Sequence, residues 1–256
     1  MWRFIFAFFA AFGWVGNAYA EGTREDPVAA LRSGNITECR GCDLSGANFK
    51  KADLSGVDLT GAILTDATFH RAKLRGAVLD GATAIGTNFN LADLTRAQMV
   101  DGDFSRAMFY GAQMSGADLS ASNLTEARMQ TARLTSAKLQ GALLDRALMQ
   151  DAVANNADFS NSSIHRTNLN GAHLGRSLFD GATINSAGFV RAEASRASFV
   201  DATISLTDFL RADLRRAKVT GATLTGNRFT TAATREVDFD NATMSGNFMA
   251  DGRLQN

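Results

Sequence analysis

The sequence predicts an all-β solenoid, a chain wound into a four-sided coil. Three observations support this fold class: a large apolar residue recurs every five residues, a small residue lies two positions before it, and the phenylalanines fall into columns spaced by 20 residues. Apolar residues recur every 3.6 residues on average in an amphipathic helix and every 2 in a half-buried strand, so a period of five fits neither. Each five-residue unit is therefore expected to form one short side of a coil.

The first segment, residues 1–20, has the pattern of a secretory signal peptide. Arg3 precedes an apolar run over residues 4–16, and Ala-Tyr-Ala at 18–20 is a sequence that signal peptidase accepts. The run has 13 residues, fewer than the ~20 that a membrane-spanning helix needs, and no later stretch approaches that length. We predict cleavage before Glu21, export to the bacterial periplasm, and no transmembrane segment in the mature chain.

The second segment, residues 21–41, is expected to cap the solenoid with a short helix. Pro27 suits the first turn of a helix because it has no N–H to leave unpaired, and Gly34 is a typical helix stop. The sequence predicts that this helix starts at about residue 26.

The repeats occupy residues 42–256 without an insertion. From Leu44 to Leu254, every fifth residue gives 43 positions, of which 39 are Leu, Phe, Met, Ile or Val. In the column two residues earlier, 30 of 43 residues are alanine. Both columns are predicted to point inward, and the remaining positions to face water or form corners.

Phenylalanine positions set the number of sides. Seven of the twelve central phenylalanines share one column when positions are sorted in steps of 20, and four more share the column two sides away. Like residues therefore stack every fourth unit, which gives a four-sided coil with nearly eleven turns. Fourteen glycines at the last position of the unit fit corners that need unusual backbone angles, and a single proline leaves almost every N–H available for pairing between coils.

Units such as Ala47-Asn48-Phe49 and Ala52-Asp53-Leu54 resemble the pentapeptide-repeat family, and the resemblance covers residues 42–256. It implies a right-handed quadrilateral parallel β-helix. The best-understood branch of that family consists of cytoplasmic, strongly acidic dimers that mimic DNA and protect DNA gyrase from quinolones. This chain differs in its signal peptide, its near-zero charge and its uninterrupted coils, so that function is not transferred.

Composition and motifs argue against catalysis and against nucleic-acid binding. The 26 basic and 26 acidic residues cancel, whereas nucleic-acid binders carry a basic excess. His70, His165 and His173 fall on different sides or distant coils, and no phosphate loop or nucleophile motif is present. We expect no enzyme activity, no cofactor and no metal site.

Cys39 and Cys42 allow two interpretations. An exported chain meets an oxidising compartment, which favours a disulfide between them. Alternatively, Cys42 fills an alanine position of the small inward column as a buried residue.

Arg176, Arg196 and Arg216 are spaced by 20 residues and are expected to stack on one corner beside Arg215. This set is a candidate contact for an anionic partner. The alternative is an ordinary solvated face of mixed charge.

The last coil carries Phe248 at a normally polar outward position, beside the inward Met249. An end coil presents unpaired backbone groups, so these residues are candidate contacts of a homodimer joined C-terminus to C-terminus. The leading hypothesis for function is an exported, non-catalytic scaffold or protein-binding rod whose partner is unidentified. The alternative is a DNA-mimic inhibitor or protector of a type II topoisomerase, which requires a cytoplasmic location.

Overall fold

Each five-residue unit forms a short extended side followed by a tight turn, as the unit around Phe49 shows. Phe49 N–H donates to the Thr68 carbonyl at 2.8 Å, and Thr68 N–H donates back to the Ala47 carbonyl at 2.9 Å. At the corner, Ala52 N–H donates to the Phe49 carbonyl at 3.0 Å, which closes the turn. The backbone polar groups of a unit are thus paired with the next coil or within the turn.

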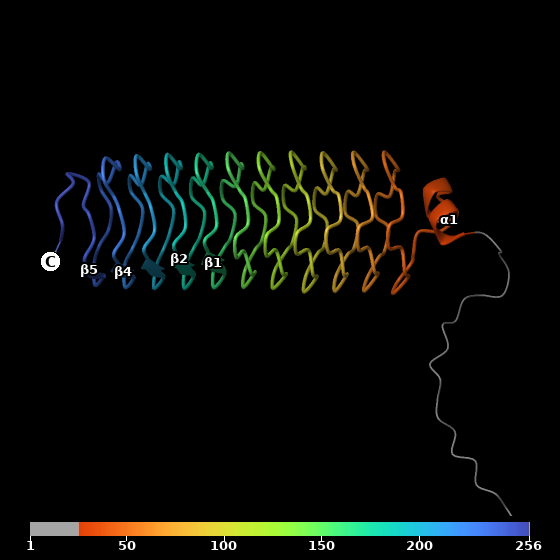
Figure 1. The fold of residues 1–256 in the computed structure, drawn as a ribbon, viewed down its shortest axis with the longest axis horizontal. Coiled ribbons are helices and arrows are strands. Elements are labelled where there is room, and N and C mark those ends of the chain that lie inside the picture. The colour runs from red at the N-terminus through yellow and green to blue at the C-terminus, as the bar shows by residue number, and fades with distance from the viewer. Residues whose placement is uncertain (1–25, 256) are drawn as a thin grey trace, which may run out of the picture.

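Repetition of this unit builds a rod. The computed structural model describes residues 26–255, in which successive coils stack side by side (Figure 1). Parallel pairing joins residues 20 apart on four sides, as in Asp43 with Ile63, Asn48 with Thr68, Asp53 with Lys73 and Asp58 with Val78. The predicted right-handed quadrilateral parallel β-helix is confirmed.

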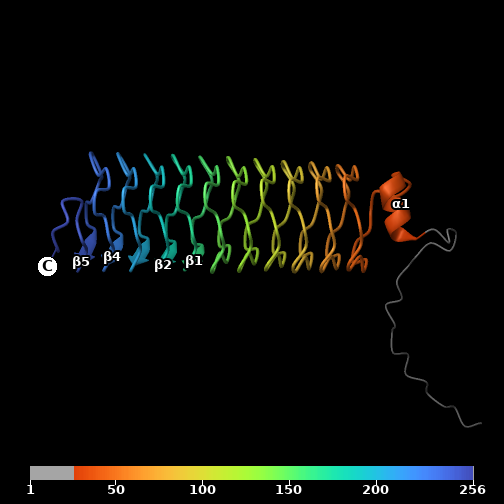
Figure 2. The ribbon, with the colours of Figure 1, turned by 45° about the horizontal axis from the view of Figure 1, so that its top comes forward.

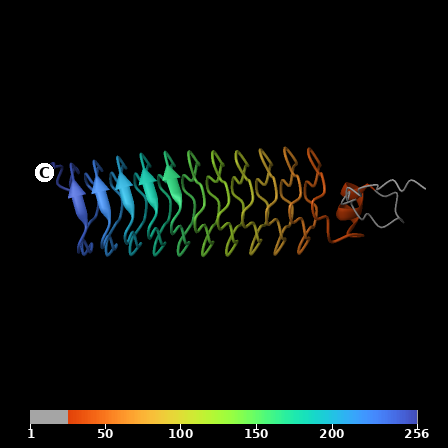
Figure 3. The same ribbon diagram turned by 90° about the horizontal axis from the view of Figure 1, so that it is seen from below.

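One side of the rod forms a regular sheet in its C-terminal half. The strands β1 (Ser163–His165), β2 (Thr183–Asn185), β3 (Thr203–Ser205), β4 (Thr223–Thr225) and β5 (Thr243–Ser245) pair in parallel in that order. Their arrows lie side by side in Figure 3. The register stays at 20 residues throughout, for example Ile164 with Ile184.

Corners need a left-handed backbone, but not always glycine. The last position of the unit has positive φ in glycines such as Gly56, at 70°, and equally in 27 other residues, including Lys51 at 58° and Arg96 at 58°. A non-glycine residue in this region costs roughly 1 kcal/mol or more, which the surrounding coils must offset. The glycine corners were predicted correctly, and the many charged corners were not.

Both inward columns form one continuous core. Phe49, Phe69, Phe89 and Phe109 stack with ring centroids 5.0–5.1 Å apart. A second stack, of Phe159, Phe179 and Phe199, has spacings of 4.8 and 4.9 Å. Phe179 also meets Phe189 of the opposite side edge to face at 5.9 Å, so the two columns touch across the interior.

Two buried asparagines form an internal ladder that the sequence pattern did not indicate. Asn227 and Asn247 occupy alanine positions and are fully buried. Asn247 Nδ2 donates to the Leu224 carbonyl at 2.9 Å, and its Oδ1 accepts from Asn227 N–H at 2.9 Å. The side-chain amide therefore pairs polar groups that an ordinary corner joins directly, which explains why these sites hold a polar residue.

The N-terminal end is covered as predicted. Helix α1 (Pro27–Ser33) begins after Asp26, whose side chain accepts from Val28 N–H at 3.2 Å, and ends at Gly34 with φ 76°. Leu31 is buried in the core cluster. Figure 2 shows α1 at the end of the rod opposite β5. Among residues 26–255, no helix is long and apolar enough to cross a membrane.

The C-terminal end differs from the predicted repeat. After Met249 the chain turns back, and Leu254 pairs antiparallel with Phe248 instead of pointing inward; Leu254 is 53% exposed. Met249 N–H donates to the Arg253 carbonyl at 2.8 Å, and Gly246 N–H to the Gln255 carbonyl at 3.0 Å. On earlier coils such groups donate to the next coil, so folding back satisfies them. Extending the β-helix through residue 256 was therefore one unit too long.

Candidate functional site

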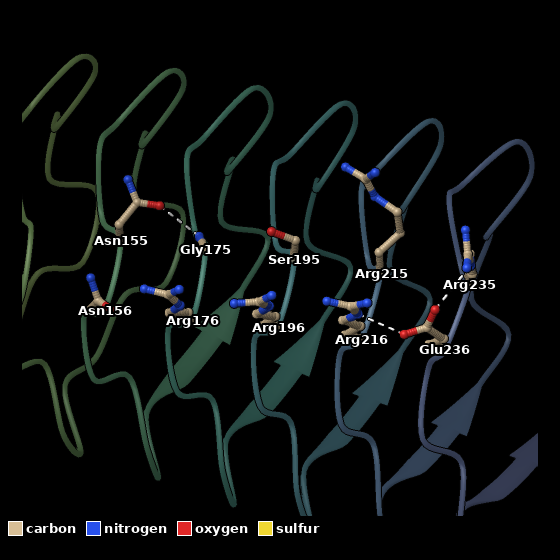
Figure 4. Close-up of a pocket in the computed structure, with 10 residues that line it drawn as sticks. All are labelled: Asn155, Asn156, Gly175, Arg176, Ser195, Arg196, Arg215, Arg216, Arg235 and Glu236. Atoms are coloured by element: carbon tan, nitrogen blue, oxygen red, sulfur yellow. Dashed lines mark hydrogen bonds and ion pairs between the residues drawn. The ribbon is translucent and has the colours of Figure 1, made fainter.

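Three stacked corners place arginines in one row along the rod. Arg176, Arg196 and Arg216 occupy the last position of their units, each with φ of 60–61°. Because each corner repeats the geometry of the corner 20 residues before it, the three side chains leave the backbone in the same direction. Figure 4 shows them in one row, between Asn156 and Glu236.

A groove of about 530 Å³ runs beside this row. Its second row comes from the preceding position of each unit, where the small residues Gly175 and Ser195 leave room between bulkier neighbours (Figure 4). The lining residues are Asn155, Asn156, Gly175, Arg176, Ser195, Arg196, Arg215, Arg216, Arg235 and Glu236. Five of the ten are arginines and one is acidic, so the groove is strongly positive.

Acidic partners neutralise the C-terminal end of the groove. Glu236 accepts from Arg216 Nε at 2.7 Å and lies 3.1 Å from Arg235 Nε. Arg215 donates to both carboxylate oxygens of Asp213, at 2.8 and 2.6 Å. The Arg215 guanidinium holds the pKa of Asp213 below its usual range, so that this carboxylate stays ionised.

The middle of the groove is different. Within residues 26–255, neither Arg176 nor Arg196 has a carboxylate oxygen within 4.0 Å. Elsewhere on the rod, cations commonly pair with a carboxylate on the adjacent coil, as Lys73 does with Asp53 at 3.0 Å. The two central arginines therefore depart from the charge pairing seen along other columns.

Hydrogen-bond donors dominate the remaining lining. Asn155 Oδ1 accepts from Gly175 N–H at 2.9 Å, so the amide nitrogen is the group that Asn155 can still offer at the groove (Figure 4). The corner N–H groups of Arg176 and Arg196 donate to the carbonyls of Ser195 and Arg215, at 3.0 and 2.9 Å. Side chains, and not free backbone groups, would therefore bind a ligand here.

The structure brings together the four arginines that the spacing predicted as one set. Arg215, however, belongs to the second row and is bound to Asp213. Sequence reasoning missed the part of Glu236, which closes the row of corners at one end, and the space left by Gly175. The same spacing of 20 residues from Arg216 and from Ser195 could have indicated both.

The other candidate residues lie away from this groove. Cys39 and Cys42 are buried and form a disulfide beside the first coil, with Cα atoms 5.4 Å apart. Phe248 is 48% exposed on the last coil, and Met249 is half-buried below it. Among residues 26–255, no cluster of three or more His, Cys, Asp or Glu side chains could hold a metal ion.

A model of pentapeptide repeats matches the chain in eight copies, which cover residues 42–181 and 194–246. The chain belongs to the pentapeptide-repeat family. Proteins of this family are generally structural or protein-binding and not enzymes. The comparison with curated proteins gave no match.

Several solved structures resemble this pentapeptide-repeat protein. HetL, a pentapeptide repeat protein involved in heterocyst differentiation regulation in the cyanobacterium Nostoc, is 25% identical with a TM-score of 0.71, over 87% of this chain and 95% of HetL. QnrB1, a plasmid-mediated fluoroquinolone resistance protein, is 17% identical with a TM-score of 0.46, over 73% and 91%. A thylakoid-lumen protein of Arabidopsis thaliana is 23% identical with a TM-score of 0.31, over 52% and 80%.

Proposed function

We propose that this chain is an exported, non-catalytic scaffold or protein-binding rod. The observation that carries the proposal is the filled interior: the buried core cluster continues from Leu31 to Ala232, with phenylalanines and leucines in contact from coil to coil. A filled solenoid offers its outer sides to a partner, and the regular spacing of its coils makes those sides long and straight.

Export is supported by the pattern over residues 1–20, which lie outside the described residues. The test is the intact mass of protein recovered from the periplasm of its host. A chain beginning at Glu21 is expected, and a full-length chain confined to the cytoplasm would contradict export. The same measurement with and without reductant should show a difference of two hydrogens from the Cys39–Cys42 disulfide.

Partner binding can be tested on all four sides of one coil. Arg128, Arg133, Lys138 and Leu143 lie on consecutive sides and are exposed. A photo-crosslinking amino acid at each position, in cells that export the protein, should give a discrete protein adduct from one or two sides. The buried neighbour Met129 is the matched control. Absence of any adduct, both from these sites and from the groove position Arg196, would refute the proposal.

The alternative, protection of a type II topoisomerase by DNA mimicry, requires a cytoplasmic location and an acidic surface. The groove of this rod is lined by five arginines and one glutamate, which is the opposite charge. Fractionation separates the two functions, because a periplasmic protein cannot reach the enzyme.

A second copy is a further proposed partner. Phe248 and Leu254 are both about half exposed and lie side by side through their antiparallel pairing. This apolar pair on the last coil supports a homodimer that forms through the C-terminal end.

A further inference from the structure

We propose that the groove beside Arg176, Arg196 and Arg216 binds an acidic, extended segment of the partner protein, whose carboxylates pair with Arg176 and Arg196. The inference rests on the proposed function of the rod as a protein-binding scaffold, and it names both the site and the chemistry of the partner segment.

The first argument is the missing counter-charge. On this corner, Arg216 has a carboxylate on the neighbouring coil, whereas Arg176 and Arg196 have none among residues 26–255. Like charges on adjacent coils repel each other, and at ~4.8 Å between coils the repulsion is only partly screened by salt. A ligand that brings two negative charges to these positions removes that repulsion.

The second argument is that the groove already holds a carboxylate of the expected kind. Glu236 lies on the same corner, one coil beyond Arg216, and its Oε2 accepts from Arg216 Nε at 2.7 Å (Figure 4). An acidic side chain of a bound segment would repeat this contact at the two preceding coils. Guanidinium groups suit the task because their donors match the two oxygens of a carboxylate.

The third argument concerns phosphate, which arginines also bind. Phosphate sites commonly use several free backbone N–H groups. Here the N–H groups of Gly175, Arg176 and Arg196 already donate to Asn155, Ser195 and Arg215, respectively. The groove therefore provides side-chain donors only, which favours carboxylates presented by a flexible chain.

The size of the groove sets the length of the segment. From Asn156 to Glu236 the row covers four coil spacings, which amounts to ~19 Å. An extended peptide rises ~3.3 Å per residue, so about six residues fill the groove. Gly175 and Ser195 leave room for its backbone beside the arginines.

The test measures fluorescence anisotropy of a labelled hexaglutamate peptide, with hexaglutamine as the uncharged control. Hexaglutamate should bind, with an affinity that falls as salt is raised, and hexaglutamine should not. The double variant Arg176→Gln/Arg196→Gln should weaken binding by about threefold to tenfold, the scale of two exposed ion pairs. Asn156→Arg, which extends the row by one coil, should strengthen binding.

The matched control is Arg71→Gln/Arg96→Gln. These arginines have the same corner conformation, with φ of 57° and 58°, and removing them changes the net charge equally, away from the groove. Equal weakening by both double variants would show general attraction to a basic surface and overturn the proposal. So would failure of hexaglutamate to bind, or arginine-dependent binding of inorganic tripolyphosphate alone. Crosslinking on the four sides of the rod would still test protein binding separately.

Discussion

The phenylalanine stack provides a sharp test of the core. Phe179 is fully buried, with the rings of Phe159 and Phe199 at 4.8 and 4.9 Å and the edge contact to Phe189 at 5.9 Å. Replacing it with alanine removes three ring contacts at once. The neighbouring rings cannot close the space, because their backbones are tied to adjacent coils by bonds such as that from Phe179 N–H to Ser198 O at 2.7 Å.

A Phe→Ala change of this kind costs ~3–5 kcal/mol. For a chain of this size each kcal/mol lowers the melting temperature by ~2–4 °C, so the expected decrease is roughly 6–20 °C. Thermal unfolding followed by circular dichroism measures it directly.

The control is Leu178→Ala, one residue earlier and 39% exposed, for which the change should stay within ~0.5 kcal/mol. Similar melting temperatures for the two variants would refute the assignment of inward and outward positions. It would also remove the argument that the rod interior is filled.

Three further predictions concern packing, pH and assembly. Ala117→Leu should overpack the fully buried small column and cost ~1–3 kcal/mol, whereas Ser120→Leu on the outer corner should cost little; chemical denaturation compares the two. Asp53, bonded to Ser55 and Lys73, and other outer carboxylates such as Asp213 have pKa values lowered from 3.8, so folding is favoured fully above that pH. As the pH falls through the lower folded pKa values this contribution is lost, and melting temperature should stay level near neutrality and drop below about pH 4. Phe248→Asp should weaken the proposed homodimer in sedimentation without altering circular dichroism, and a monomeric wild type would reject that dimer.

Sequence periodicity was sufficient for the fold because each unit repeats the same local decision. The large and small columns determine which two side chains of a unit face inward, and the 20-residue spacing of the phenylalanines determines how many units close a coil. The end of the rod was less predictable. Leu254 continues the periodic pattern, yet it is exposed because the last backbone groups find partners in an antiparallel return.

The sequence by itself determined the repeat, its inward and outward positions, the four sides, helix α1 near Pro27 and the row of Arg176, Arg196 and Arg216. Only the tertiary structure decided which of those arginines lack a counter-charge, because ion pairs form between different coils and depend on where each flexible side chain ends. It also decided that Asn227 is buried without cost to its polar groups, since its partners come from neighbouring coils. A period specifies positions along the chain, whereas pairing of polar and charged groups depends on distances that exist only once the coils are stacked.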